Sequence, residues 1–150
     1  MDEDGIRDLR NYVGGGFVEH DGPEWMDVLE PATGARFARL PLSGSNDVDA
    51  AVESARGAQP GWAALGMDAR ADWLDKIADS LEASFEEVAE LESRDTGKPI
   101  SLARAVDANR SVANFRFFAE LIREQEQETF EMDDATNYVV NRPVGVGALI

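Results

Sequence analysis

The last seven residues, Val144-Gly145-Val146-Gly147-Ala148-Leu149-Ile150, form an uninterrupted apolar run. Runs of this kind are typical of strands in a parallel α/β sheet, which are buried on both faces. The sequence therefore predicts a strand over residues 144–150. No helix and no second parallel strand follows it within the 150 residues. We therefore expect this strand to be an interior element of a larger sheet.

The glycines at positions 145 and 147 also match the beginning of a dinucleotide-binding fingerprint. That fingerprint needs a third glycine three residues later, at the start of a helix. Ile150 stands at that position. A strand of small residues that packs closely against its neighbours is therefore favoured over a phosphate-binding loop.

Upstream of this run, Tyr138-Val139-Val140 begins a predicted strand that Pro143 interrupts, because proline lacks the N–H that a ladder needs. Residues 125–134 are acidic and weakly periodic, which predicts a loop. Residues 100–124 have helical periodicity. The apolar residues expected on one side of that helical region are Leu102, Val106, Ala113, Phe117 and Leu121.

Two further helices are predicted before residue 100. The first begins at Ser45 or Asn46, and Gly57, Pro60 and Gly61 should end or loosen it, with Trp62 anchored in the core. The second runs from about residue 68 to residue 96, and Gly97 is expected as its left-handed cap, with Pro99 opening the next helix. The apolar stripe of the second helix is Leu74, Ile77, Leu81, Phe85, Val88 and Leu91.

Residues 10–42 read as short strands and turns. Tyr12-Val13 and Phe17-Val18 flank three glycines and predict a hairpin. Residues 26–29 and 36–41 have strand character, and Pro31-Ala32-Thr33-Gly34 predicts a turn between them.

Composition restricts the possible functions. The chain has 14 Lys+Arg against 30 Asp+Glu, a net charge of −16, one His and no Cys. Zero Cys excludes disulfides, thiolate metal sites and a cysteine nucleophile in these residues. The acidic charge argues against nucleic-acid binding, and no apolar run is long enough to span a membrane.

The acidic N-terminus is unlike a signal peptide, so we expect a cytoplasmic protein. Only Lys76 and Lys98 are lysines, which favours a salt-adapted, halophilic protein over an ordinary acidic bacterial one.

No position has chemistry that assigns it a catalytic role. His20 lies between acidic residues and is expected to be an exposed, non-catalytic side chain. The glycines at 14–16 are expected in a turn and not around a phosphate. Carboxylates on a helix usually form a solvated face, and arginines among them usually pair with such carboxylates. The carboxylates in question are Glu86, Glu87 and Glu90, and the arginines are Arg104, Arg110, Arg116 and Arg123. The core is expected to contain the aromatic residues Phe115, Phe117, Phe118, Trp62 and Trp73.

Five segments, in order, resemble the N-terminal part of the NAD(P)-dependent aldehyde dehydrogenases, over nearly all of residues 11–150. Glu30 departs from the Asn usual in the second segment. The segments are Tyr12-Val13-Gly14-Gly15-Gly16-Phe17-Val18, Leu29-Glu30-Pro31-Ala32-Thr33-Gly34, residues 48–62, residues 70–91 with Arg94-Asp95-Thr96-Gly97-Lys98-Pro99, and Asn141-Arg142-Pro143-Val144-Gly145-Val146. Residues 101–104 and 113–119 are most similar to the muconic semialdehyde branch, with betaine-aldehyde-type enzymes next.

The resemblance implies an α/β fold: N-terminal β-hairpins, three long helical regions, and strands entering a Rossmann-like sheet that is truncated. The implied parts are a flexible acidic N-terminus over residues 1–10, the helical and hairpin part of the cofactor-binding domain over 11–137, a strand resembling the oligomerisation segment over 138–143, and the first Rossmann-like strand over 144–150.

In the family a cysteine attacks the aldehyde, hydride passes to NAD or NADP, and a glutamate activates water. The resemblance places both catalytic motifs beyond the point matched by Ile150. We therefore assign no catalytic, cofactor-binding or metal residue to this chain and expect no cofactor to bind it alone. Some relatives hold a structural monovalent cation near the positions matching Leu29 and Asp95, but another ligand comes from the missing part, so no site is assigned.

Two hypotheses follow. In the first, the chain is the N-terminal portion of an aldehyde dehydrogenase that acts on a small-molecule aldehyde and is a homo-oligomer when complete, and the 150 residues alone are inactive. In the second, the chain is a non-catalytic interaction or regulatory module that docks on a full-length homologue.

Overall fold

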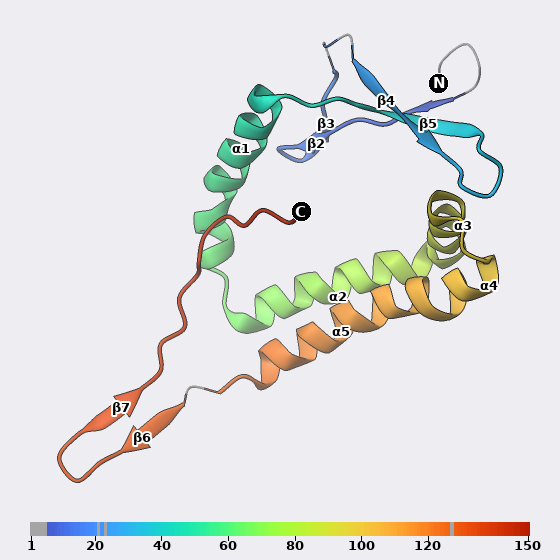
Figure 1. Ribbon diagram of the computed structural model, residues 1–150. Coiled ribbons are helices and arrows are strands. Elements are labelled where there is room, and N and C mark those ends of the chain that lie inside the picture. Colours follow the sequence, from blue (N-terminus) through green and yellow to red (C-terminus); the bar gives the residue numbers. More distant parts are fainter. Residues whose placement is uncertain (1–5, 21, 23, 127) are drawn as a thin grey trace.

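A computed structural model describes residues 6–20, 22, 24–126 and 128–150. The chain is a mixture of short strands and long helices (Figure 1). In order, the elements are β1 (Arg7–Asp8), β2 (Tyr12–Val13), β3 (Gly16–Phe17), β4 (Trp25–Leu29), β5 (Arg36–Pro41), α1 (Ser45–Ala63), α2 (Met67–Ala83), α3 (Phe85–Thr96), α4 (Ile100–Leu102), the π-helix η1 (Ala103–Ala108), α5 (Asn109–Glu124), β6 (Thr129–Glu131) and β7 (Thr136–Tyr138).

The N-terminal strands confirm the predicted hairpin and the two strands after it. β2 pairs with β3 around Gly14 and Gly15, whose φ angles of 64° and 85° glycine adopts without strain. β5 lies at the centre of a three-stranded sheet, antiparallel to β4 and parallel to β1. Within residues 1–10, which were expected to be a flexible acidic terminus, Arg7 and Asp8 form β1 and pair with β5, whereas residues 1–5 lie outside the described residues.

Helix α1 is longer than predicted. It continues through Gly57 and Pro60 to Ala63, so these residues do not end it. Pro60 lies in the last turn, where the missing N–H costs one hydrogen bond, and its carbonyl oxygen accepts a bond from the Ala64 N–H at 3.0 Å. Trp62 does not anchor in a core: no residue of α1 is buried, and the indole is about half exposed.

The second predicted helix is divided into α2 and α3 at Ser84, whose φ and ψ angles of −106° and 21° are not helical. The predicted end of α3 is confirmed. Gly97 has the left-handed φ of 75°, and Pro99 is the N-cap of α4.

The third helical region is continuous but not regular, because residues 103–108 form the π-helix η1 between α4 and α5. Helices α2 and α5 lie side by side and run in opposite directions (Figure 1). The predicted apolar stripe on this region faces solvent: Leu102, Val106, Phe117 and Leu121 are exposed. Ala119 is buried instead, because alanines allow two helices to approach more closely than large side chains do.

The predicted core aromatics are largely exposed as well. Trp73, Phe117 and Phe118 are each about half exposed. The buried apolar residues among those described are small, and no large side chain there is fully buried. They are Ala38, Ala71, Ala78, Ala89, Ala103, Ala108 and Ala119.

The C-terminal part corrects two further predictions. Residues 129–131 form β6, where a loop was expected, and β6 pairs with β7 in an antiparallel hairpin. The expected strand over 138–143 is limited to the end of β7 at Tyr138, and residues 144–150 are irregular and largely exposed, not a strand. A strand exists only with a partner to complete its ladder, and none of the described strands pairs with residues 144–150.

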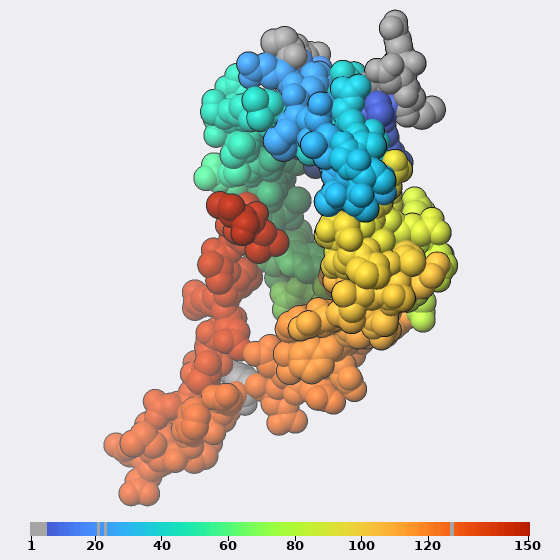
Figure 2. All heavy atoms as spheres, turned by 45° about the vertical axis from the view of Figure 1, so that its right-hand side comes forward, coloured from blue at the N-terminus to red at the C-terminus, as the bar shows by residue number. Residues whose placement is uncertain are grey.

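The elements surround an opening instead of a filled centre. In Figure 2 the β6–β7 hairpin projects from the body of the molecule. An open space separates α1 and the C-terminal residues from the yellow helical region that contains α3. The chain of 16.4 kDa exposes 11332 Å², whereas a folded monomer of that mass exposes about 7500 Å². Within the described ranges, no helix is long and apolar enough to cross a bilayer.

Candidate functional site: the paired turns at Glu30 and Gly97

Two of the motif segments form turns that meet in space. The first turn follows β4, where the N–H groups of Thr33 and Gly34 donate to the Glu30 carbonyl oxygen at 3.2 and 2.7 Å. The Thr33 hydroxyl accepts a bond from the Ala35 N–H at 3.2 Å, and Gly34 has a φ of 71°. These local bonds define the turn over residues 30–35.

The second turn joins α3 to α4. The Gly97 N–H donates to the Ser93 carbonyl oxygen at 2.9 Å, and the Ser93 hydroxyl donates to the Lys98 carbonyl oxygen at 2.7 Å. The left-handed φ of Gly97 lets the chain reverse here, and Pro99 then starts the next helix.

The two turns contact each other through a close approach and an ion pair. A β-carbon on Gly97 would lie 2.9 Å from the Pro31 Cβ, which is shorter than any ordinary contact. Arg94 donates from Nε to Glu30 Oε2 at 3.2 Å, and its guanidinium lies 4.6 Å from the centre of the Phe37 ring. This cluster, the paired turns, joins the three-stranded sheet to the helices.

Lys98 extends the join to the next element. Its ammonium lies 2.8 Å from Glu92 Oε1 and 2.9 Å from Asp107 Oδ2, so it connects α3 with η1. Hydrogen bonds to Glu92 and then to Asp107 raise the pKa of Lys98, and the lysine therefore stays charged. Sequence reasoning missed this role; the signal was that Lys98 is one of only two lysines among 14 cations.

A cleft of about 690 Å³ lies between the sheet and α3, and Asp95 is among its lining residues. The lining is largely apolar, with Phe37, Leu40, Val88 and Leu91 contributing. Val28 also lines it, so the structure brings the end of β4 and Asp95 to the same cleft. Within the described ranges, no group of three acidic or imidazole side chains is suited to hold a metal.

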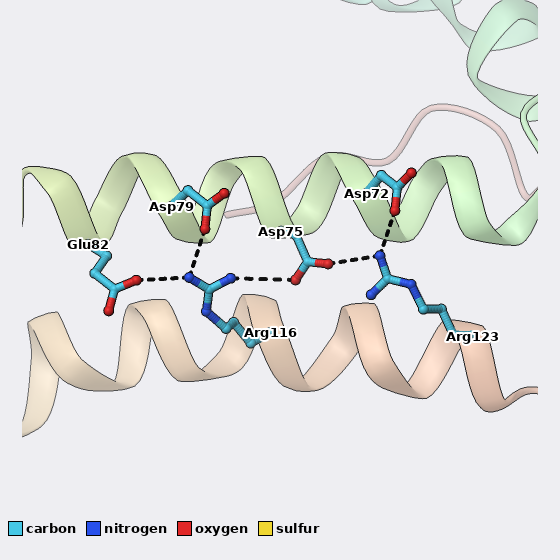
Figure 3. A network of polar contacts seen from close by, with 6 residues as sticks. All are labelled: Asp72, Asp75, Asp79, Glu82, Arg116 and Arg123. Atoms are coloured by element: carbon cyan, nitrogen blue, oxygen red, sulfur yellow. Dashed lines mark hydrogen bonds and ion pairs between the residues drawn. The ribbon is translucent and has the colours of Figure 1, made fainter.

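A second polar cluster holds α2 against α5 (Figure 3). Arg116 contacts Asp79 and Glu82 at 2.8 Å each and Asp75 at 3.7 Å, and Arg123 contacts Asp72 at 2.6 Å and Asp75 at 2.8 Å. Hydrogen bonds to these carboxylates raise the pKa of both arginines. Two of the four arginines that were expected to pair with carboxylates therefore do so here.

The other residues that the sequence singled out lie outside these two clusters. Arg104 pairs with Glu86 at 2.8 Å, whereas Glu87 and Glu90 are exposed on α3. The Nε2 atom of His20 lies 3.1 Å from the Glu24 carbonyl oxygen, and its ring meets Trp25 edge-on. The imidazole is therefore partly buried between a backbone carbonyl and an indole ring.

Gly145 and Gly147 match the first two glycines of a dinucleotide-binding loop. A phosphate site of that kind needs glycines that lead into a helix N-terminus. Gly145 has a φ of 113°, but residues 139–150 are irregular and no described helix begins there. Residues 139–150 therefore do not have the strand–loop–helix arrangement of the dinucleotide fingerprint.

Comparison with known proteins places this arrangement in a family. The profile of the aldehyde dehydrogenase family matches residues 17–150. The 2-aminomuconic semialdehyde dehydrogenase of Bos taurus is 43% identical over 148 residues, covering 97% of this chain and 30% of that protein. Lactaldehyde dehydrogenase from Escherichia coli superposes with a TM-score of 0.81 at 32% identity, over 87% of this chain and 27% of that one. An NAD+ complex of the aldehyde dehydrogenase from Bacillus cereus gives a TM-score of 0.79 at 32% identity, over 88% and 28%.

The chain therefore belongs to the aldehyde dehydrogenase family, and its fold is the N-terminal part of the family fold. It spans about 30% of the length of the curated relatives it matches. The muconic semialdehyde resemblance noted in residues 101–104 and 113–119 agrees with the bovine relative.

Proposed function

We propose that this chain is the N-terminal part of an NAD(P)-dependent aldehyde dehydrogenase and that the 150 residues alone do not oxidise aldehydes. The complete reaction converts an aldehyde, water and oxidised nicotinamide cofactor into a carboxylic acid and reduced cofactor. The chain contains no Cys and so supplies no thiolate nucleophile. Its role is to form the outer frame of the cofactor-binding domain.

The paired turns carry this proposal. Two motifs that are more than 60 residues apart in the sequence meet through Gly97, Pro31 and the Arg94–Glu30 ion pair. A join of this kind positions a sheet and a helical layer relative to each other, which is what a cofactor-binding domain needs from its frame. For the substrate we propose an aldehyde of the muconic semialdehyde class, because that name belongs to the bovine relative.

A single-chain chimera tests the proposal. Residues 1–150 are fused to the part of the bovine 2-aminomuconic semialdehyde dehydrogenase that follows its match to Ile150. Aldehyde-dependent formation of NADH or NADPH is then followed by absorbance at 340 nm, in molar KCl and in dilute buffer. We expect the chimera to oxidise its aldehyde, and the 150-residue chain and the bovine part, each alone, to remain at the enzyme-free background.

Two results would overturn the proposal. Aldehyde oxidation by the purified 150-residue chain would contradict its inactivity. A folded chimera, verified by circular dichroism, that oxidises neither 2-aminomuconic semialdehyde nor acetaldehyde would contradict the assigned role.

The exposed β6–β7 hairpin favours a second candidate, an interaction module for a full-length homologue. Phe130, Met132 and Tyr138 are each more than half exposed there, and an open strand edge readily pairs with another chain. The expected homo-oligomer of the complete enzyme would use the same surface. Mixing the chain with the active bovine enzyme discriminates: a module changes that enzyme's oligomeric mass or rate, whereas an unpaired N-terminal part leaves both unchanged.

A further inference from the structure

The helical stretch from α4 to α5 has apolar side chains on two opposite sides. The inner side packs on α2, where Ala119 is fully buried and Arg116 reaches the carboxylates of that helix. The outer face consists of residues that remain 42–57% exposed: Leu102, Val106, Phe117, Phe118 and Leu121. A helix that is apolar on both sides is typical of an element buried between two layers, and the described chain provides only one of them.

The exposed area of the chain indicates how much surface a partner would have to bury. The chain exposes 11332 Å², which is about 3800 Å² more than expected for its mass. A dimer contact of standard size covers only about 800 Å² of each partner. A standard contact with a second copy of this chain is therefore too small to account for the excess, whereas an extensive obligate contact has the right size.

The solved relatives supply a cover of that size. The lactaldehyde dehydrogenase structure matches 87% of this chain but only 27% of its own length, so its unmatched part is more than twice as large as the matched part. We propose that the outer face of α4–α5 is a docking surface for the C-terminal remainder of the aldehyde dehydrogenase fold, and that it binds this remainder even as a separate polypeptide. The inference rests on the proposed function and extends it to a particular surface.

The chemistry of the face predicts how the association responds to salt. Its residues are aliphatic and aromatic, and burial of such surface is not weakened by salt, whereas contacts between exposed charges are screened. The complex should therefore persist in molar KCl. An association driven by the acidic surface would instead depend strongly on ionic strength.

The experiment mixes the 150-residue chain with an affinity-tagged bovine part that begins after its match to Ile150. Size-exclusion chromatography with light scattering and binding titrations are run in 0.1 M and 1 M KCl. We expect a complex with one copy of each polypeptide at both salt concentrations. Phe117→Glu on the outer face should weaken binding at least tenfold. Val48→Glu, the same change of chemistry at a helical side chain that is 56% exposed on α1, should leave binding unchanged.

Several outcomes would overturn the inference. These are no complex in either salt, equal weakening by Phe117→Glu and Val48→Glu, or a homodimer of the chain that Phe117→Glu dissociates. Because Phe117 is exposed, circular dichroism should show that its variant folds like the parent chain. Binding is read separately from catalysis, so a complex without aldehyde oxidation supports the docking surface while contradicting the proposed function.

Discussion

At the scale of single residues, Gly97 combines two constraints on what can replace it. Its φ of 75° favours glycine, and a side chain there would also press against Pro31. Both constraints act on the contact that joins the sheet to the helices. The neighbouring Lys98 then fixes the start of the next helical region through Glu92 and Asp107.

Gly97→Ala should therefore destabilise the chain. We expect a loss of about 1–3 kcal/mol in the free energy of unfolding, measured by urea titration with circular dichroism at 222 nm. Gly57→Ala is the matched control, because Gly57 lies within α1 and a β-carbon there meets nothing within 4 Å. That control should gain about 0.5–1 kcal/mol. Equal effects at the two positions would contradict the role of the paired turns.

Residues in local turns could be predicted from the sequence, and residues in long-range contacts could not. The Gly97 cap follows from its position after a helical period and before a proline, which are local signals. The Lys98–Asp107 contact and the approach of Gly97 to Pro31 depend on how separate elements pack, and no periodicity encodes that. The motif resemblance located both turns but not the bonds between them.

At the scale of elements, the prediction was accurate for the existence of helices and wrong about which side is buried. Counting large apolar residues selected Leu102, Phe117 and Leu121, whereas α5 packs on α2 through the small Ala119. The run over residues 144–150 has the composition of a buried strand, yet composition alone cannot provide the partner strands that a ladder requires.

Strand β1 provides an element whose attachment should depend on pH. The Arg39 side chain donates to both carboxylate oxygens of Asp8 and lies 4.6 Å from the centre of the Trp25 ring. The hydrogen bond from Arg39 lowers the pKa of Asp8 below its ordinary value. A lowered folded-state pKa means that the stabilisation is complete above about pH 4 and is lost as the pH falls through the folded-state value.

The Leu9 amide reports on this attachment, because it donates to the Arg39 carbonyl oxygen at 2.9 Å. In NMR spectra the chemical shift of the Leu9 amide should move towards the value of an unpaired strand residue as the pH is lowered below about 4. Asp8→Asn should remove this acid step. Asp27→Asn, which affects a separate pair with Arg36 at 3.2 Å, should retain it. Persistence of the step in Asp8→Asn would assign the transition to another group.

At the scale of the whole molecule, charge and exposed area act together. The net charge of −16 is spread over a surface about half as large again as that of a compact chain of this mass. Mutual repulsion opposes compaction of the helices. The ion pairs of Arg116 and Arg123 offset it only between α2 and α5.

Salt should therefore increase order. Raising KCl from 0.1 M to 1 M shortens the Debye length from about 10 Å to about 3 Å, which screens the repulsion across the surface. We expect stronger helical ellipticity at 222 nm and a higher urea midpoint in 1 M KCl. Choline chloride should act equally if screening is the cause. A decrease in both quantities would contradict the salt-adapted interpretation and show that the interhelical ion pairs dominate.

The π-helix η1 has a consequence for insertions and deletions. Its wider turn accommodates one more residue than an α-helix would, so Ile100 can pack near Ala89 while Ala119, 19 residues after Ile100, still turns towards α2. Removing one residue between 103 and 108 would let this turn return to ordinary α-helical winding, and the residues after it would keep their orientation. A deletion in the regular part of α5 before Ala119 would instead rotate everything after it by about 100° and turn Ala119 away from α2, so a loss of one residue is tolerated in one turn and disruptive in the next.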